Sequence, residues 1–343
     1  MHVASKRVFR LSLTIALSLA VAYGTAQTAP YIAPLFAFML GVAPKPPMGP
    51  KGLLGLLLML CVMLSSGLLL IPLLLQYPAT ALLLALAGLF VANYVTLNLG
   101  KQPLGSLLVI GITLISAMGL LDFAIALLLI QALCINIAIA VICQWLVYPL
   151  FPEDGPLPAP APPAPEQSSW LALRATLIVF PSFLLVLVNP LLYAPIIMKS
   201  VALGQQVSET HARSAGRELL GSTLMAAVLA ILMWYGLKLA PTLWMFFLWT
   251  LAFGLFIVAR VYGVIRSRYS PSFWSNVVIT LLIFIGPAVE DSAAGRDPYA
   301  ASAVRLGLFM GVAIYAWLML LFLDGWRARR SARVTSPTAL EVS

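Results

Sequence analysis

Long apolar runs follow one another along most of this chain, and short polar or proline-containing stretches separate them. A transmembrane helix needs roughly 20 mainly apolar residues. The runs are apolar on every face, whereas barrel strands alternate apolar and polar positions. The pattern therefore predicts an all-α polytopic membrane protein with twelve spans, and eleven or thirteen also fit because three runs have unusual lengths. The predicted spans are residues 8–25, 29–43, 53–75, 78–98, 103–119, 123–149, 170–189, 192–207, 218–237, 241–262, 271–288 and 304–323.

Composition agrees with this pattern. Hydrophobic residues make up 62% of the 343 residues and only 9% are charged, and the mean hydropathy is +1.02. These values lie far outside the range of soluble domains. We expect the chain to be embedded in a lipid bilayer.

The charges predict how the spans are oriented. With the N-terminus in the cytoplasm, seventeen of the twenty Lys and Arg residues fall on the inner side, and only Lys238, Arg296 and Arg305 fall outside. This bias is the positive-inside signature. It accounts for the net charge of +9 without a nucleic-acid partner, and it places both termini in the cytoplasm.

The first segment also has the features of a cleaved signal peptide, because Lys6, Arg7 and Arg10 precede an apolar core. We reject that interpretation because Arg10 has a counterpart at the head of the seventh span, Arg174. Both spans also lead into an Ala-Pro pair. A removable signal would not have a copy in mid-chain.

Further matches at offsets of 161 to 168 residues keep their order along the chain, for example Leu53-Leu54-Gly55 with Leu219-Leu220-Gly221 and Pro103 with Pro271. An even number of spans gives both halves one orientation, as in parallel repeats. We therefore expect two six-helix repeats. The predicted parts are a first repeat (1–151), a Pro/Ala-rich cytoplasmic linker (152–169), a second repeat (170–326) and a basic cytoplasmic tail (327–343).

Motifs of catalysis and metal binding are missing from the sequence. The three cysteines lie in apolar runs without metal-ligand spacing, and no Walker, dinucleotide-binding, zinc-protease or nucleophile-elbow motif occurs. We expect no catalytic residue, no metal site and no cofactor, and hence no enzyme.

Polar residues inside the spans point to function more directly, because each costs free energy in lipid unless it faces a neighbour or water. Lys199, in the short eighth span, either snorkels to the inner interface or lines a path. Arg260 is either an interfacial anchor or part of an inner vestibule. The uncharged amides at membrane depth either join helices by hydrogen bonds or line a substrate path; they are Asn93, Gln131, Asn136, Gln144 and Asn276.

Charges also gather between the eighth and ninth spans, at the predicted cytoplasmic mouth. Glu218 falls in the first turn of the ninth predicted span, where the helix dipole favours an anion. Arg217 would either anchor to headgroups or bind an incoming anion. The candidate residues of the substrate path or cytoplasmic mouth are Lys199, Arg213, Arg217, Glu218, Arg260, Asn93 and Asn136.

Residues 191–205 and 215–256, together with the six-plus-six layout, resemble the membrane part of the fusaric acid resistance and aromatic acid exporter family of bacterial inner-membrane proteins. In that family an Arg precedes a helix start that contains Gly and Thr, here Arg217, Gly221 and Thr223. The resemblance implies export of aromatic carboxylic acids by secondary transport, often beside a periplasmic adaptor of the membrane fusion type. This chain lacks the large cytosolic domains of longer members and is similar to a compact branch.

We therefore expect an inner-membrane secondary transporter that exports small, anionic organic compounds. An anion channel would use the same cationic mouth, and a non-transporting structural subunit would use the amides only for packing. The expected partners are the lipid bilayer, a small organic anion and a periplasmic membrane-fusion adaptor, with no nucleic acid; an oligomer is compatible with this sequence.

The acidic residues suggest the driving force. Proton-driven carriers hold a carboxylate deep in the membrane, whereas Asp122, Glu218, Glu290 and Asp324 all fall at predicted span ends. The sequence thus predicts that no buried carboxylate carries a proton. Export of an anion would then be electrogenic and driven mainly by the membrane potential.

The predicted orientation can be tested with reporter fusions after Ser169 and after Ser343. Both should report the cytoplasm, because the charge bias places the linker and the C-terminus on the inner side. A periplasmic signal from either fusion would rule out the twelve-span topology.

Overall fold

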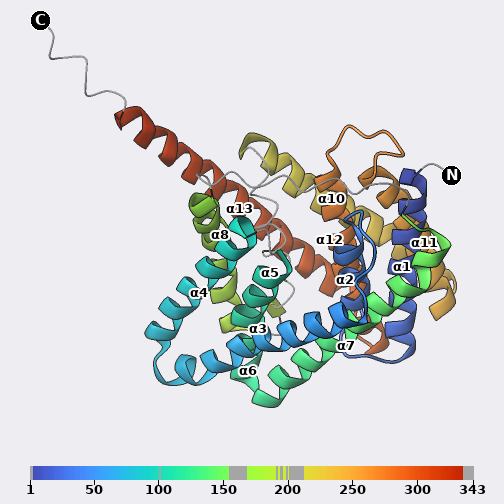
Figure 1. Cartoon of the computed structure of the whole chain (residues 1–343), viewed down its shortest axis with the longest axis horizontal. Coiled ribbons are helices and arrows are strands. Elements are labelled where there is room, and N and C mark those ends of the chain that lie inside the picture. Colours follow the sequence, from blue (N-terminus) through green and yellow to red (C-terminus); the bar gives the residue numbers. More distant parts are fainter. Residues whose placement is uncertain are drawn as a thin grey trace, which may run out of the picture.

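The computed structural model of the chain describes residues 3–99, 102–153, 168–190, 192–193, 196–197, 200 and 212–334. Side chains are described in these ranges except at 102–103, 168, 212–217, 320 and 324–334. The described part is all-helical (Figure 1). Its elements are α1 Val3–Gly24, α2 Ile32–Gly41, α3 Pro50–Gln76, α4 Pro78–Asn98, α5 Gln102–Ile110, the π-helix η1 Gly111–Ile115, α6 Ser116–Leu121, α7 Phe123–Val147, the 3₁₀ turn η2 Tyr148–Leu150, α8 Ser168–Val188, α10 Ala212–Leu239, α11 Leu243–Val261, α12 Pro271–Ala293 and α13 Pro298–Val334.

Eleven of the twelve predicted spans correspond to these elements, with α5, η1 and α6 together forming one of them. The predicted eighth span falls largely outside the described residues. Ten described helices are long and apolar enough to cross a membrane. The exception is α2, which has only 10 residues where the sequence predicts a span over 29–43. Before it, Ala26 and Ala29 adopt positive φ angles, and this non-helical backbone postpones the helix to Ile32.

Local chemistry explains where several helices begin. The side chains of Asp122, Thr242 and Ser270 accept hydrogen bonds from the free backbone N–H groups at the first turns of α7, α11 and α12. Prolines open α3, α4 and α12, where a missing N–H costs nothing. Capping residues and prolines in the sequence thus mark where these helices begin in the structure.

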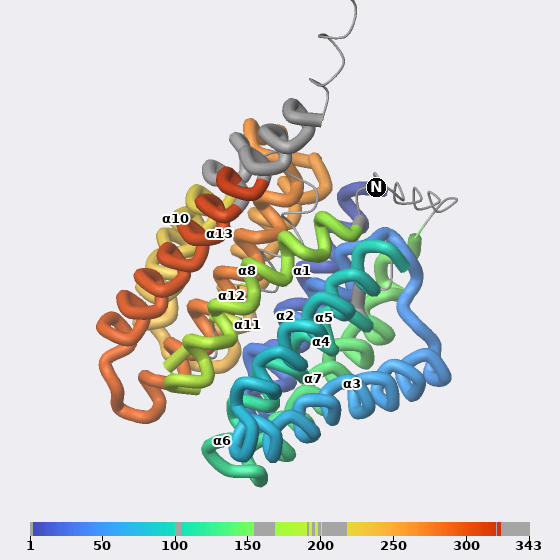
Figure 2. The backbone as a smooth tube through the Cα atoms, turned by 90° about the vertical axis from the view of Figure 1, so that its left-hand side faces the viewer, coloured from blue at the N-terminus to red at the C-terminus, as the bar shows by residue number. Residues whose placement is uncertain are grey.

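The helices form two groups, which Figure 2 shows side by side, with the blue-to-green helices apart from the yellow-to-red ones. In the first group α3 packs against α4, against the α5–η1–α6 helix and against α7. In the second group α10 packs in the same way against α11, α12 and α13. Between the groups, α1 contacts α11 and α8 contacts α4. The two groups thus have similar contacts; the predicted repeats would make α1 correspond to α8 and α4 to α11.

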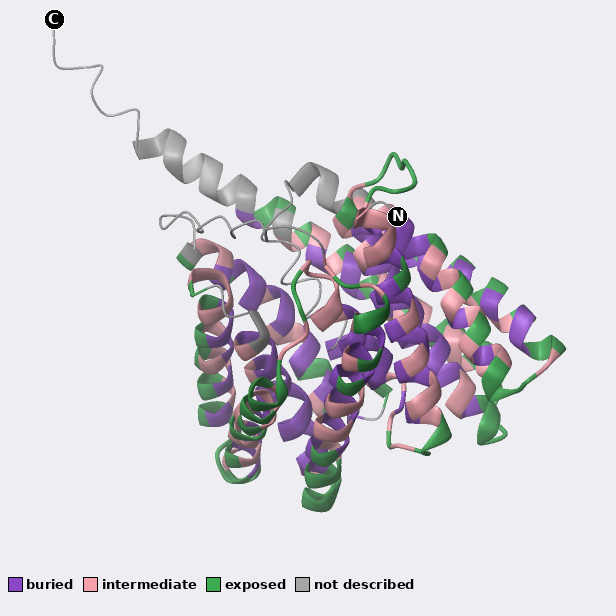
Figure 3. Cartoon of the chain, turned by 45° about the vertical axis from the view of Figure 1, so that its right-hand side comes forward, coloured by how far each residue is buried: buried purple, intermediate pink, exposed green. Residues whose placement is uncertain are grey.

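Burial follows the same arrangement (Figure 3): the helix faces that meet are buried, while the outer faces are exposed and apolar. Leu54, Leu58 and Leu69 on α3 expose 68 to 73% of their surface. Leucines at that exposure would be costly in water, but acyl chains cover such surfaces without cost. The chain is a multi-pass membrane protein.

The longest helix is α13, with 37 residues. At 1.5 Å per residue it is about 55 Å long, whereas its membrane-spanning part is Pro298–Leu323. Figure 1 shows its C-terminal part extending past the neighbouring helices. Part of the predicted cytoplasmic tail, residues 327–334, therefore continues the helix.

We call the side of the bundle where α1 begins the amino side, and the opposite side the far side. On the amino side, Arg7 and Arg10 of α1 bind Glu153, just after α7. Arg10 places Nη2 2.7 Å from Oε2 of Glu153 and donates from Nη1 to the carbonyl oxygen of Phe151 at 3.2 Å. The side chain of Glu153 is only 5% exposed. The start of the predicted linker is thus bound to the first helix.

Close backbone contact joins α3 to the π-helix in the first group. A Cβ atom on Gly67 would overlap the carbonyl oxygen of Gly111 in η1, and one on Gly111 would lie 2.5 Å from the carbonyl oxygen of Met63. Both positions therefore need glycine for the two helices to approach.

We expect Gly67→Ala to lower the melting temperature in detergent by several degrees, because the methyl group would push α3 away from η1. Gly55→Ala, on the same helix, is the control: nothing lies within 4 Å of its added Cβ, and Ala favours a helix over Gly by up to about 1 kcal/mol. Equal melting temperatures for the two variants would contradict the importance of this contact.

The ion cluster at Glu153 should make stability depend on pH. Burial alone would raise the pKa of Glu153, but the hydrogen bonds and charges of Arg7 and Arg10 outweigh it and hold that pKa below its ordinary value. This stabilisation is complete above the ordinary pKa of glutamate, and it is lost as the pH falls through the lower pKa of the folded protein.

We expect Glu153→Gln to melt below the wild type at pH 7, and the difference to shrink as the pH falls through the acidic range. Thermal unfolding in detergent between pH 7 and pH 3 measures both effects. The control is Asp297→Asn, at an exposed carboxylate that accepts from the backbone N–H of Tyr299. Asparagine can keep this cap, so the variant should melt close to the wild type throughout. A difference that stays constant down to pH 3 would mean that the charge of Glu153 does not matter.

Candidate functional site

The candidate site is a seam between α10 and α12, which pack against each other along their length. On α12 one stripe recurs every four residues: Asn276, Thr280, Phe284 and Ala288. The facing stripe of α10 contains Ser222, Thr223, Ala227, Ala230 and Trp234. On both helices the stripe is polar toward the amino side and apolar or aromatic toward the far side.

Glu218 lies at the amino end of the seam. Its carboxylate accepts hydrogen bonds from Ser270 at 2.9 Å and from Ser272 at 3.2 Å, both at the start of α12. The predicted place of Glu218 in a first helical turn is wrong, because α10 begins six residues earlier, at Ala212. Two serine hydroxyls at the start of α12, rather than the first turn of its own helix, hold this charge.

Deeper in the seam the polar groups are fully enclosed. The side-chain amide of Asn276 donates to the hydroxyl of Ser222, and both residues are buried. Thr223, the residue after Ser222, and Thr280, one turn after Asn276, are also buried. Asn276 thus makes the interhelical hydrogen bond expected of an amide at membrane depth.

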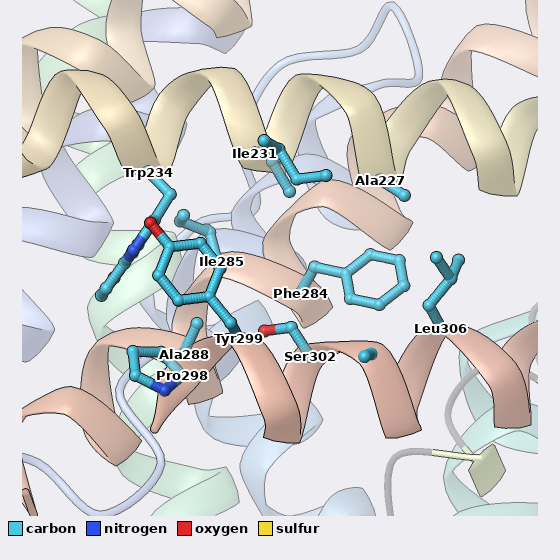
Figure 4. Close-up of a pocket in the computed structure, with 12 residues that line it drawn as sticks. Ala227, Ile231, Trp234, Phe284, Ile285, Ala288, Pro298, Tyr299, Ser302 and Leu306 are labelled. Carbon is cyan, nitrogen blue, oxygen red and sulfur yellow. The ribbon is translucent and has the colours of Figure 1, made fainter. Parts of the chain in front are cut away.

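Toward the far side, α13 closes the seam into a pocket with a volume of about 280 Å³ (Figure 4). Trp234 of α10 and Tyr299 of α13 lie at one end, Phe284 of α12 and Leu306 of α13 at the other, and the hydroxyl of Ser302 points inward. The pocket is therefore mostly apolar and aromatic.

A second cavity, of about 640 Å³, adjoins this pocket, because Trp234 lines both. Tyr23 at the end of α1, Lys238 at the end of α10 and Phe246 of α11 contribute to its wall. The ammonium group of Lys238 lies 4.6 Å from the ring centre of Tyr299. The indole N–H of Trp234 is buried and has no hydrogen-bond partner among the described residues. One cation and one unused donor thus lie beside the aromatic walls.

Arg260 lies at the end of α11, outside the seam. Its guanidinium covers the ring of Phe256 at 3.7 Å and that of Trp274 at 4.9 Å, and it donates to the carbonyl oxygen of Phe256 at 2.7 Å. These contacts hold the arginine on its own helix and on the start of α12. They favour the anchor over the vestibule.

The other candidate amides also lie away from the seam. Asn93 donates to Thr176 at 3.0 Å and joins α4 to α8. Asn136 of α7 donates to the carbonyl oxygen of Thr28 at 3.1 Å, in the non-helical segment before α2. Its own Oδ1 is buried without a partner in the described part of the chain. Asn136 thus steadies irregular backbone, which membrane proteins allow only where protein or a cavity surrounds it.

The side chains of three residues of the predicted mouth are not among those that the structure describes. Lys199 lies outside the described residues. Arg213 and Arg217 belong to the backbone of α10, one turn apart, but their side chains are not among those described. Among the mouth residues whose side chains the structure describes, Glu218 lies at the seam.

The sequence prediction of no buried carboxylate is wrong. Helix α12 continues to Ala293, beyond the predicted end at 288, so Asp291 lies within the helix and is only 7% exposed. Its Oδ2 lies 2.6 Å from Nη2 of Arg305 in α13.

Sequence reasoning also missed the far-side residues Trp234, Lys238 and Tyr299. Aromatic and basic residues at span ends are typical of the membrane interface, so nothing in their spacing distinguished a pocket wall. Within the described residues, no three His, Cys, Asp or Glu side chains gather in a way that could hold a metal ion.

Comparison with known proteins adds a family match but no activity. Residues 7–147 match the model of a family described as "Protein of unknown function (DUF2955)". No curated protein and no solved structure matches the chain. The matched segment runs from α1 to the last residue of α7, so the family match covers the first helix group and stops where that group stops.

Proposed function

We propose that this protein is a secondary transporter of the inner membrane that exports small organic anions, with aromatic carboxylates as the favoured class. The observation that carries the proposal is the seam, in which a buried polar stripe continues into an aromatic pocket with a lysine beside it. The charge bias of the sequence assigns the amino side to the cytoplasm. The polar end of the seam would then receive the anion and the pocket would release it outward.

Comparison of the two halves supports a role for the polar stripe beyond packing. At the offsets that relate the halves, Ser222 and Thr223 correspond to Leu56 and Leu57, and Asn276 and Thr280 correspond to Leu108 and Ile112. At these four positions the first half has apolar residues, and the buried hydroxyls of its α5–η1–α6 helix lie at other positions, Ser106, Thr113 and Ser116. Because buried polar groups cost free energy in lipid, packing does not account for them in the second half.

The pocket has the chemistry of a site for a ring with an acidic group. Its volume is near the lower end of the range for ligand sites, about 300 Å³, which suits a small molecule. The rings of Trp234, Tyr299 and Phe284 offer flat apolar surface to an aromatic ring. Ser302 and Lys238 can donate hydrogen bonds to a carboxylate.

Outward movement of an anion needs no proton. In a cell that is negative inside, the membrane potential favours the exit of a monovalent anion by about 2.3 kcal/mol per 100 mV. Arg305 neutralises the buried carboxylate of Asp291, so that carboxylate does not require a proton-driven cycle. We therefore propose electrogenic export, with a periplasmic membrane-fusion adaptor as the partner that the family resemblance implies.

The test measures efflux of benzoate from loaded proteoliposomes at pH 7.5, where benzoate is ionised. A potential set with valinomycin, negative inside, should accelerate efflux, and a pH gradient alone should not. Asn276→Leu restores the residue of the first half and should slow efflux about tenfold, because it removes the deepest amide of the seam. Asn93→Leu is the matched control, since it removes a similar interhelical hydrogen bond between α4 and α8.

If Asn276→Leu and Asn93→Leu transport equally well, the seam is not the route. Conductance steps in planar bilayers would identify an anion channel instead. Vesicles that retain benzoate under every gradient would leave the protein as a structural subunit.

A further inference from the structure

An ion pair beside the pocket extends the proposed function, on which this inference rests. Asp291 on α12 follows the pocket-lining Ala288 by three residues, and Arg305 on α13 lies between the pocket-lining Ser302 and Leu306. The pair joins the two helices at their far-side ends. Neither residue lines the pocket, but each lies within one helical turn of residues that do, so the pair is next to the pocket.

Arg305 contacts Asp291 through one of its two terminal nitrogen atoms. Its Nη2 contacts Oδ2 of Asp291 at 2.6 Å, while its Nη1 is buried and has no hydrogen-bond partner among the described residues. A guanidinium normally binds a carboxylate through two parallel N–H donors. A buried donor without a partner costs about 1–3 kcal/mol. Arg305 therefore has a donor for which a second carboxylate oxygen is the natural partner.

Asp291 is also held from the solvent side. Arg296, in the turn between α12 and α13, lies 3.6 Å from Oδ1 of Asp291, and its side chain is 75% exposed. Asp291 therefore has a second cation that keeps its charge balanced when Arg305 turns away. The adjacent Glu290 lies close enough to interact electrostatically with both members of the pair.

We propose that Arg305 is the carboxylate-binding residue at the exit of the pocket, and that Asp291 occupies it when no anion is present. The arriving carboxylate exchanges with Asp291 on the guanidinium, and Asp291 shifts its ion pair to Arg296. Asp291 competes with the anion for the same guanidinium and keeps the anion from staying long. A transport site has to be weak enough to release what it binds.

Benzoate binding to the purified full chain in lipid nanodiscs, measured by titration calorimetry at pH 7.5, tests this exchange. Asp291→Asn should tighten binding about fivefold, because it removes the internal competitor. Arg305→Lys should weaken binding about tenfold, because it keeps the charge but loses the two-donor fork. Arg266→Gln is the control: it removes an exposed arginine in the loop between α11 and α12, which has no part in the exchange, and should change the dissociation constant less than about twofold.

The results separate the two proposals. If the wild type binds benzoate and neither Asp291→Asn nor Arg305→Lys changes the dissociation constant, Arg305 is not the exit residue, and the proposed transport function stands. If the wild type binds no benzoate, the proposed function fails and this inference with it. Should Asp291→Asn not yield folded protein, Arg305→Lys decides alone, because it preserves the ion pair with Asp291.

Discussion

Every polar group inside this bundle needs a partner within the protein, because hydrocarbon offers none. The constraint begins with the backbone, which is helical through nearly all of the described residues. It continues at helix ends, where Asp122, Thr242 and Ser270 satisfy free N–H groups. It also explains why Glu218 is bound by two serines. The few groups that escape this rule, such as the indole N–H of Trp234 and Nη1 of Arg305, are therefore informative about what else binds there.

The two halves use one packing scheme for different purposes. In the first group α3 packs against α4, the α5–η1–α6 helix and α7. In the second group α10 packs against α11, α12 and α13. In the first half the closest of these contacts is a glycine contact, Gly67 with Gly111, in the middle of an apolar interface. In the second half the corresponding interface carries hydroxyls and an amide, and it ends in a pocket. The same packing arrangement thus accommodates a close backbone contact in one half and polar side chains with a pocket in the other.

The sequence predicts most of the fold, because span length and hydrophobicity depend on composition alone. Eleven runs coincide with helices, and the capping residues mark their starts. The short α2 was not predictable in the same way, since the positive φ angles of Ala26 and Ala29 follow from tertiary contacts rather than from residue type. The end of α12 was misjudged because a charged residue lowers hydropathy, although Asp291 is paired inside the bundle with Arg305.

The sequence predicts less of the candidate site than of the fold. The polarity of Glu218, Asn93, Asn136 and Asn276 predicts that they matter, but hydropathy does not tell which neighbours they meet. Asn276 faces Ser222 in the seam, whereas Asn93 and Asn136 hold other helices. The pocket depends on three helices that meet at Trp234, Phe284 and Tyr299. Residues so far apart in the sequence come together through helix packing, which the hydropathy pattern does not predict.

The length of α13 has a mechanical consequence. This uninterrupted helix begins at the pocket, with Tyr299, and continues to Val334. A continuous helix behaves as a stiff rod, and at about 1.5 Å per residue Tyr299 lies about 50 Å from Val334. A tilt of about 5° around the pocket would displace the other end by about 4 Å, at 1.5 Å of rod per residue. The helix would thus act as a lever that pivots at the pocket and whose other end emerges on the amino side.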